Sequence, residues 1–207
     1  MSENAFGADN QQATPLSGGA SETTRQAPFT KKEILAYLNG AIHDATLNKG
    51  KRIRFAQKEK RWLEILRQLF KTLKYNSWIY KEGRERNVYV LETLCPELDF
   101  HFDPSKCSAR EKLAYIRGFF DAEGGIPHNG KRFYIQLVQK NFEKVFLLKQ
   151  LLQDVGIKSG KIHNPSKQID PHYWRIFVLT KSQKKFAEKI GSYHPIKAEI
   201  FHERMKI

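Results

Sequence analysis

Residues 114–126 have the sequence AYIRGFFDAEGGI, and residues 36–40 (AYLNG) resemble its first five positions. Three further matches follow in the same order: FAQK at 55–58 with LVQK at 137–140, LRQL at 66–69 with LKQL at 148–151, and VYVL at 88–91 with IFVL at 176–179. The spacing between matched segments only grows, from 78 to 88 residues. Ordered matches of this kind indicate an internal duplication, in which the second copy has the longer loops.

Each copy predicts the same succession of secondary structure. Thr30 and Ser108 are suitable N-caps for the first helix of each copy. Apolar residues that alternate with polar ones predict strands with one buried face, and an amphipathic pattern predicts a helix after each such strand. The expected helices are 31–44, 58–73, 109–122, 141–155, 182–190 and 196–205, and the expected strands are 51–55, 77–80, 87–92, 132–137, 161–163 and 174–179.

This order predicts an α/β (α+β) fold made of two similar halves. The first repeat would span residues 29–93 and the second residues 108–207, with a linker at 94–107. Residues 1–28 contain almost no large apolar side chains, so we expect a disordered tail there.

The chain is strongly basic. Its 207 residues include 36 Lys and Arg against 22 Asp and Glu, which gives a net charge of +14. The expected tail carries −2, so the remaining residues carry +16. An excess of this size predicts a polyanionic partner, and nucleic acid is the usual one.

Composition also excludes several classes of protein. A mean hydropathy of −0.59, with no long apolar run, argues against a membrane protein. Cys95 and Cys107 do not form a CxxC pair, so a zinc site and a disulfide scaffold are both disfavoured. The beginning of the chain has neither the basic start nor the apolar segment of a signal peptide, so we expect a cytoplasmic, nucleoid-associated protein of a prokaryotic cell.

Small residues recur along the first helix of each copy, at Ala36 and Gly40 and again at Ala114 and Gly118. Small residues three to four positions apart let two helix backbones approach closely. We therefore expect these helices to pack on each other about a pseudo-twofold axis, with their C-terminal ends side by side.

Acidic side chains stand at both of these helix ends. Asp44 follows the first helix, and Asp121 and Glu123 close the second. The helix dipole disfavours a carboxylate at a C-terminus, so acids placed together there predict a cation between them. Carboxylates around hard divalent ions beside a basic surface suit phosphodiester hydrolysis. Considered alone, Asp121 and Glu123 would be ordinary surface acids before a Gly-Gly turn.

Residues 114–126 resemble the LAGLIDADG motif of homing endonucleases, because they combine the central Gly118 with the ending Asp-Ala-Glu-Gly and a strand after it. The duplicated order covers nearly all of residues 30–207, so the chain resembles the monomeric, two-repeat members. The resemblance implies a pseudo-symmetric pair of αββαββα halves, with Gly40 and Gly118 at the helix interface and antiparallel sheets forming a saddle on double-stranded DNA. It also implies cleavage of both strands across the minor groove with Mg²⁺, leaving 3′ overhangs, and a metal ligand at Glu123.

The first copy departs from the family pattern. Alignment on Gly40 places Ala45 opposite Glu123, which would leave one site without its acid. Alignment of the helix ends, with one residue fewer, places Asp44 there instead, and Asp44 is the only acid between Glu33 and Glu59. With Asp44 both sites have a metal ligand, whereas with Ala45 the protein would nick one strand or only bind. A third alternative is a displaced Asp44 with weak activity.

Alternation sorts the side chains of the first strand of each copy. Ile53 and Phe55 would face the core, and Arg52 and Arg54 would face a DNA groove, where arginine commonly bonds guanine. Many of the remaining basic residues would contact phosphate and position the protein. The complete set of expected DNA-binding residues is Arg52, Arg54, Arg84, Arg86, Asn87, Arg132, Tyr134, Gln136, His163, Lys167 and Arg175.

Four polar residues complete the expected site. Gln57 and Gln139 close equivalent strands near the helix ends, where they could orient water or a phosphate. Lys81 and Lys161 are candidates for stabilising charge that develops on the phosphate.

Three functions compete on these observations. The first is a site-specific, Mg²⁺-dependent DNA endonuclease encoded within an intron. The second is a non-catalytic binder of the same fold, either a maturase that binds intron RNA or a DNA-binding regulator. The third, a basic structural protein, does not explain why helices with small residues recur and end in acids.

Overall fold

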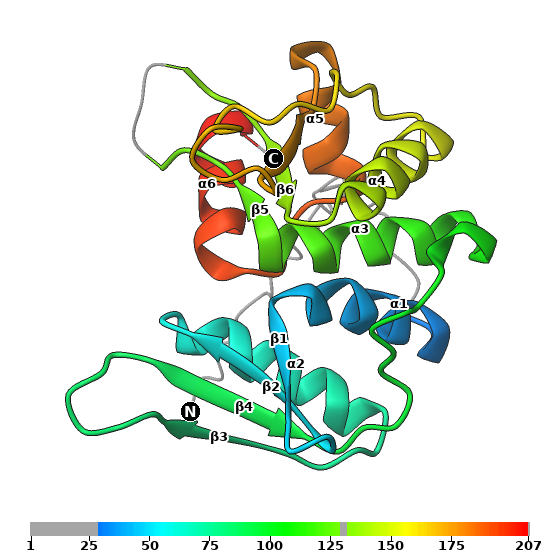
Figure 1. The fold of residues 1–207 in the computed structure, drawn as a ribbon. Helices are drawn as coiled ribbons and strands as arrows, with labels where there is room; N and C mark the ends of the chain where they lie inside the picture. The colour runs from blue at the N-terminus through cyan, green and yellow to red at the C-terminus, as the bar shows by residue number, and fades with distance from the viewer. Residues whose placement is uncertain (1–28, 129–131, 207) are drawn as a thin grey trace, which may run out of the picture.

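The computed structural model describes residues 29–128 and 132–206 (Figure 1). No helix in these ranges is long and apolar enough to cross a membrane. The first half comprises α1 (Lys31–Ala41), the 3-10 turn η1 (Ile42–Asp44), β1 (Ala45–Asn48), β2 (Arg52–Gln57), α2 (Lys60–Thr72), β3 (Ser77–Lys81) and β4 (Tyr89–Thr93). A 3-10 turn η2 (Pro104–Lys106) precedes the second half, which comprises α3 (Ala109–Glu123), β5 (Gly124–Gly125), β6 (Gln136–Gln139), α4 (Phe142–Asp154), β7 (Trp174–Phe177), α5 (Thr180–Lys189) and α6 (Pro195–Met205). The prediction on residues 1–28 lies outside the described residues.

The first helix of each half begins in the same way. The Thr30 hydroxyl accepts the backbone N–H of Glu33 at 3.2 Å, and the Glu33 carboxylate accepts the N–H of Thr30 at 3.1 Å. Ser108 and Glu111 form the same reciprocal capping box at the start of α3. Both predicted N-caps are therefore confirmed, and each box satisfies backbone donors that the first helical turn leaves free.

Two antiparallel sheets flank the central helices, with strand orders β1-β2-β4-β3 and β5-β6-β7. Two expected strands were wrong, and one observed strand was not predicted. Strand β1 was not predicted, because ATLN is too short to show a period. In the second half, residues 132–135 precede β6 without being part of it, and residues 161–163 form no strand but only the isolated bridge between His163 and Arg175.

A helix covers the inner face of each sheet. Leu63, Leu66 and Phe70 on α2 are fully buried, as the amphipathic pattern predicts, and they share one core with Phe55 of β2. In the second half the equivalent residues of α4 and β6 are also buried. This arrangement leaves the other face of each sheet free to meet a partner.

Helices α1 and α3 lie side by side through the centre of the molecule, and each leads into the first strand of its half (Figure 1). A Cβ atom added at Gly40 would overlap the carbonyl oxygen of Tyr115 and lie 2.8 Å from the nitrogen of Phe119. One added at Gly118 would overlap the carbonyl oxygen of Tyr37 in the same way. Only glycine permits this approach, so the predicted helix contact is confirmed at both positions.

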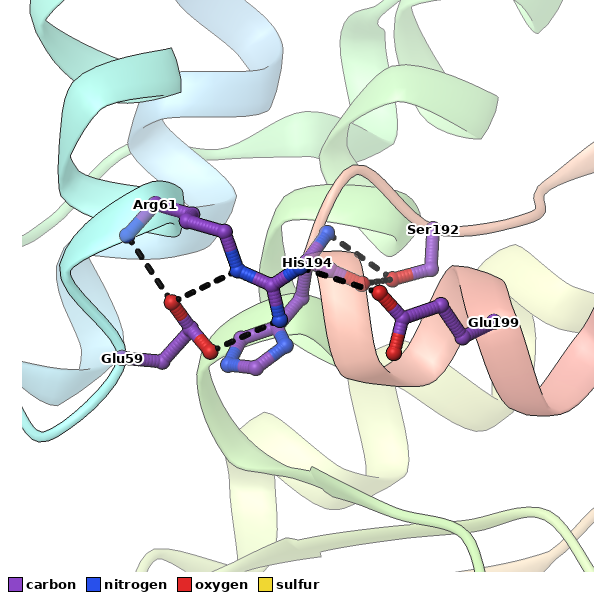
Figure 2. Close-up of polar contacts among 5 residues, drawn as sticks. All are labelled: Glu59, Arg61, Ser192, His194 and Glu199. Carbon is purple, nitrogen blue, oxygen red and sulfur yellow. Dashed lines mark hydrogen bonds and ion pairs between the residues drawn. The ribbon is translucent and has the colours of Figure 1, made fainter.

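A second junction joins α2 of the first half to α6 of the second (Figure 2). Arg61 donates to Glu59 at 2.9 to 3.0 Å and to Glu199 at 3.0 Å. The ring of His194, directly before α6, lies 5.7 Å from the ring of Trp62. These contacts hold the start of α6 against the first half, which matters because α6 carries a lysine that reaches the central helix ends.

Candidate active site and nucleic-acid interface

Each half places one carboxylate beside one glutamine at the end of its central helix. Asp44 is the last residue of η1, and Gln57 at the end of β2 donates a hydrogen bond to its Oδ2. Glu123 is the last residue of α3, and Gln139 at the end of β6 donates to its Oε1 at 3.5 Å. The four residues therefore form two equivalent carboxylate–amide pairs.

The strand register aligns the two halves. Ala45, the residue after the first acid, pairs with Phe55, and Gly124, the residue after the second acid, pairs with Leu137. Because the sequence repeat matches Phe55 with Leu137, Ala45 corresponds to Gly124. The acid before Ala45, Asp44, thus occupies the position of Glu123. From Gly40 to Asp44 the chain uses one residue fewer than from Gly118 to Glu123. The 3-10 turn at the end of α1 lies in this shorter segment.

The two carboxylates influence each other. Burial raises the pKa of Asp44 from 3.8 to about 6, against the hydrogen bond from Gln57, which lowers it. Burial and repulsion by Asp44 raise the pKa of Glu123 from 4.5 to about 7. Ionised acids in this state are poorly compensated by the protein alone, which favours a bound cation.

Lys197 of α6 is a member of this cluster that sequence reasoning missed. Its Nζ donates to the carbonyl oxygens of Phe120 and Asp121 at 2.6 and 2.9 Å, at the C-terminal end of α3, where a cation is favourable. Burial lowers its pKa to about 8, and Asp121, Asp44 and Glu123 oppose that effect. Nothing local in the sequence distinguishes this lysine from its neighbours, because only the docking of α6 brings it here.

Two tyrosines cross the helix interface in equivalent ways. Tyr37 of α1 donates to Asp121 Oδ2 at 2.7 Å, and Tyr115 of α3 lies 2.7 Å from His43 Nε2 through its hydroxyl. Lys144 of α4 approaches the other ring nitrogen of His43 at 3.3 Å. Burial and the Lys144 charge lower the pKa of His43 to about 3, so its imidazole is neutral.

Asp121, the other acid at the end of α3, has a structural role. It is 1% exposed, and besides Tyr37 it accepts the Ser192 hydroxyl and the backbone N–H of Tyr193, the latter at 2.9 Å. Both of its oxygens thus accept hydrogen bonds, whereas Glu123, within the described residues, accepts the one bond from Gln139 at Oε1.

The donor chemistry of the site fits a hard divalent ion. Within residues 29–128 and 132–206, no group of three or more His, Cys, Asp or Glu side chains could hold a metal. Asp44 and Glu123 supply two carboxylates, and Mg²⁺ is commonly bound by one or two carboxylates that share it with water and substrate phosphates. The residues present therefore suit an ion that is completed by DNA.

Lys81 and Lys161, the two lysines proposed from the sequence, lie farther along the sheets than the carboxylate–glutamine pairs. Lys81 ends β3 and is level with Gln57, with Tyr89 of β4 between them. Lys161 lies in the segment that follows Gly160 beside β7, and its side chain is exposed. In the part of the chain that the structure describes, the polar contacts of Asp44 and Glu123 come from the glutamines, not from these lysines.

The outer face of the first sheet carries the predicted basic residues. Ile53 and Phe55 are 5% and 1% exposed, whereas Arg52 and Arg54 point to the other face, as alternation predicts. The connection between β3 and β4 adds Arg84, Arg86 and Asn87, all exposed.

The outer face of the second sheet is hollowed. A groove of about 540 Å³ is lined by Arg132, Tyr134, Gln136, Arg175 and Phe177, among others. His163 lies beside it and accepts the Nε–H of Arg175 at 3.0 Å. Lys167 is exposed in the loop before β7. The expected DNA-binding residues are thus distributed over both outer faces.

Comparisons with known proteins agree with this architecture. Residues 110–191 match the family model of the LAGLIDADG-like domain. Homing endonuclease I-ApeI of Aeropyrum pernix is 31% identical over 93 residues, which cover 44% of this chain and 40% of that relative. The structure of I-DmoI in complex with DNA and Mn has a TM-score of 0.59 and 21% identity, covering 80% of this chain and 99% of that one. The N-terminal LAGLIDADG domain of DUF199/WhiA has a TM-score of 0.64 and 20% identity, covering 80% and 86%.

The two central helices with acids at their ends, each followed by an antiparallel sheet, define a LAGLIDADG fold. The family model matches residues 110–191, which are less than half of the chain, and the solved structures show the same fold at 20–21% identity. The aligned segment spans less than half the length of the curated relative.

Proposed function

We propose that this protein is a site-specific endonuclease that hydrolyses phosphodiester bonds in a long double-stranded DNA target. The observation that carries the proposal is the pair of equivalent carboxylate–glutamine contacts at the adjoining ends of α1 and α3. Two such pairs, one from each half, match a reaction that must be performed on two strands.

Asp44 and Glu123 would hold the divalent ion, for which Mg²⁺ is our candidate. When bound, the ion activates water and stabilises the leaving oxygen. Gln57 and Gln139 keep one oxygen of each carboxylate oriented, which leaves the other available. Lys197 partly offsets the acidic charge at the end of α3 before metal arrives.

The remaining assignments concern the DNA. We assign the eleven predicted interface residues to groove and phosphate contacts, and Lys81 and Lys161 to stabilising charge on the scissile phosphate. Solved complexes support a DNA substrate and a divalent metal, because I-DmoI has been crystallised with DNA and Mn and with DNA and Ca.

Selection from a double-stranded DNA library tests the proposal. With Mg²⁺ present, the wild-type protein should cut a defined subset of sequences in both strands, and chelation should stop it. Asp44→Asn and Glu123→Gln should abolish double-strand cleavage while retaining binding. Glu199→Gln, which removes an acid on α6 that bonds Arg61, is the matched control and should cut normally. Absence of cleavage from the whole library would contradict the proposal.

The second candidate is a non-catalytic binder of the same fold, which the chain shares with the WhiA domain. A DNA-binding regulator, or a maturase that binds intron RNA, would bind its nucleic acid tightly without metal. Asp44→Asn and Glu123→Gln would then leave its regulatory or splicing activity unchanged. Comparing DNA and intron RNA in the same binding assay, with and without Mg²⁺, separates these functions from cleavage.

A further inference from the structure

Equivalent positions at the centre of the two outer sheet faces hold side chains of opposite chemistry. Glu92 of β4 pairs with Arg54 of β2, one residue after buried Leu91. In the second sheet Phe177 of β7 pairs with Gln136 of β6, one residue after buried Ile176. The register therefore aligns Leu91 with Ile176 and Glu92 with Phe177, so the sequence match of 88–91 with 176–179 was wrong by three residues. A carboxylate in one half is therefore replaced by an aromatic ring in the other.

In the first half, Glu92 lies close to the guanidinium groups of Arg52 and Arg54. It is 3% exposed although it lies on the outer face, and it accepts Arg52 Nη1 at 3.3 Å and the Tyr80 hydroxyl at 2.9 Å. Arg54 Nε lies 4.0 Å away, and the same guanidinium also bonds Glu82 at the start of the β3–β4 connection. The two arginines that alternation assigns to the DNA groove are thus held by acids before any DNA binds.

In the second half, Phe177 packs against two rings and a guanidinium group. It lies 5.6 Å from the ring of Tyr134 in an edge-on contact and 5.6 Å from the ring of His163 in a stacked one. The guanidinium of Arg175 lies over the same ring at 4.9 Å. This cluster borders the groove of about 540 Å³.

We propose that Glu92 is a positioning residue that holds Arg52 and Arg54 for base readout, so that the DNA half-site under the first sheet is selected for guanine. The half-site under the second sheet meets the ring-lined groove instead, so the effect of Glu92 is confined to one half-site. This inference rests on the proposed DNA-binding function and adds the role of Glu92 in base recognition by the first sheet.

Ion pairing with Glu92 leaves guanidinium donors available for base recognition. A guanidinium has five N–H donors, and bonding to Glu92 occupies only a fraction of them, so others can still reach the O6 and N7 atoms of guanine. An arginine tied to a buried carboxylate cannot swing freely to a backbone phosphate. Without the Glu92 carboxylate, Arg52 would lose its acid partner and Arg54 would keep only Glu82, so both guanidinium groups could turn to phosphates, which carry no sequence information.

The test is selection of bound sequences from a randomised double-stranded DNA library, with Ca²⁺ present, for the wild type, Glu92→Gln and Phe177→Leu. We expect Glu92→Gln to lower the preference for guanine about tenfold in one half-site only, because a good bidentate pair discriminates by about 1–3 kcal/mol. Its affinity for random DNA should rise, with a salt dependence steeper by about one or two, since each phosphate contact adds about 0.9 to the slope. Phe177→Leu should change only the other half-site.

Glu199→Gln is the matched control, because it makes the same charge change at an acid that pairs with Arg61, away from both sheets. It should leave the selected sequences unchanged. Glu82→Gln, at a more exposed partner of Arg54, provides a second variant if Glu92→Gln does not fold, and it should relax guanine preference in the same half-site.

Different outcomes test the proposed function and the role of Glu92. A wild type that selects no sequence overturns the proposed function. A wild type that selects a two-part target, with a Glu92→Gln profile that is unchanged or weakened equally in both half-sites, overturns this inference alone.

Discussion

Replacing Glu123 with glutamine should stabilise the metal-free protein at the same time as it abolishes cleavage. Glu123 is partly buried and lies in the field of Asp44, and both effects oppose its ionised form. Glutamine has the same shape and no charge, and its amide can still meet Gln139. The substitution therefore removes an electrostatic penalty without creating a cavity.

The magnitude follows from the pKa. A rise from 4.5 to about 7 corresponds to roughly 3 kcal/mol, at about 1.36 kcal/mol for each pKa unit. Because the carboxylate is partly exposed, solvent screening should reduce the effect to about 1–2 kcal/mol. A gain of this size raises the melting temperature of a protein of this length by about 2–8 °C.

The gain should depend on pH in a defined direction. The folded state binds the Glu123 proton more tightly than the unfolded state, so this group contributes stability below pH 4.5, which is lost as the pH rises to about 7. Wild type and variant should thus be similar below about pH 4.5 and differ most at about pH 8.

Urea unfolding of both proteins in a chelating buffer, at about pH 4.5 and about pH 8, measures this difference. Adding Mg²⁺ at the higher pH should stabilise the wild type more than the variant, because the ion binds the folded carboxylates. A variant that is equally stable or less stable than the wild type at about pH 8 would refute the reasoning.

Other substitutions and conditions give further expectations. Cleavage by the wild type in Mg²⁺ should increase as the pH rises through about 6 to 7, because Asp44 and Glu123 must lose their protons to bind the ion, and initial rates across this range would show it. Gly118→Ala should destabilise by about 3 kcal/mol or more, because its Cβ would meet the backbone of Tyr37, whereas Gly83→Ala, at a positive φ with open space around it, should cost about 1 kcal/mol in the same unfolding assay. Tyr37→Phe should destabilise by about 2 kcal/mol, because it removes one of the three hydrogen bonds to Asp121 and leaves the indole N–H of Trp62 without its partner, while Tyr115→Phe, which loses one bond to His43, should cost about 1 kcal/mol.

Much of the architecture could be predicted from local signals. Three features depend only on residues that are close in sequence, so they can be recognised without knowing the fold. They are the two capping boxes, the small residues at Gly40 and Gly118, and the amphipathic stripe of α2. The pairing of Gln57 with Asp44 and of Gln139 with Glu123 was accessible through the internal repeat, which places the same residue type at the same point twice.

Other features depend on how distant elements dock. Lys197 and Lys144 reach the helix ends from α6 and α4, and no spacing in the sequence indicates that. Glu92 stands between buried Leu91 and Thr93, and its pairing with two arginines follows from the order of β2 and β4 in the sheet. The missing strand at 161–163 has a similar cause, because only His163 in that segment pairs with β7.

The central claim is that Asp44 and Glu123 together hold divalent metal against DNA. A crystal structure of the protein with its selected DNA and Mn²⁺, with anomalous scattering recorded for the metal, tests this directly. We predict metal density bound by both carboxylates beside a phosphate at the ends of α1 and α3. Metal bound elsewhere on the protein–DNA complex, or bound by Glu123 without Asp44, would contradict the account.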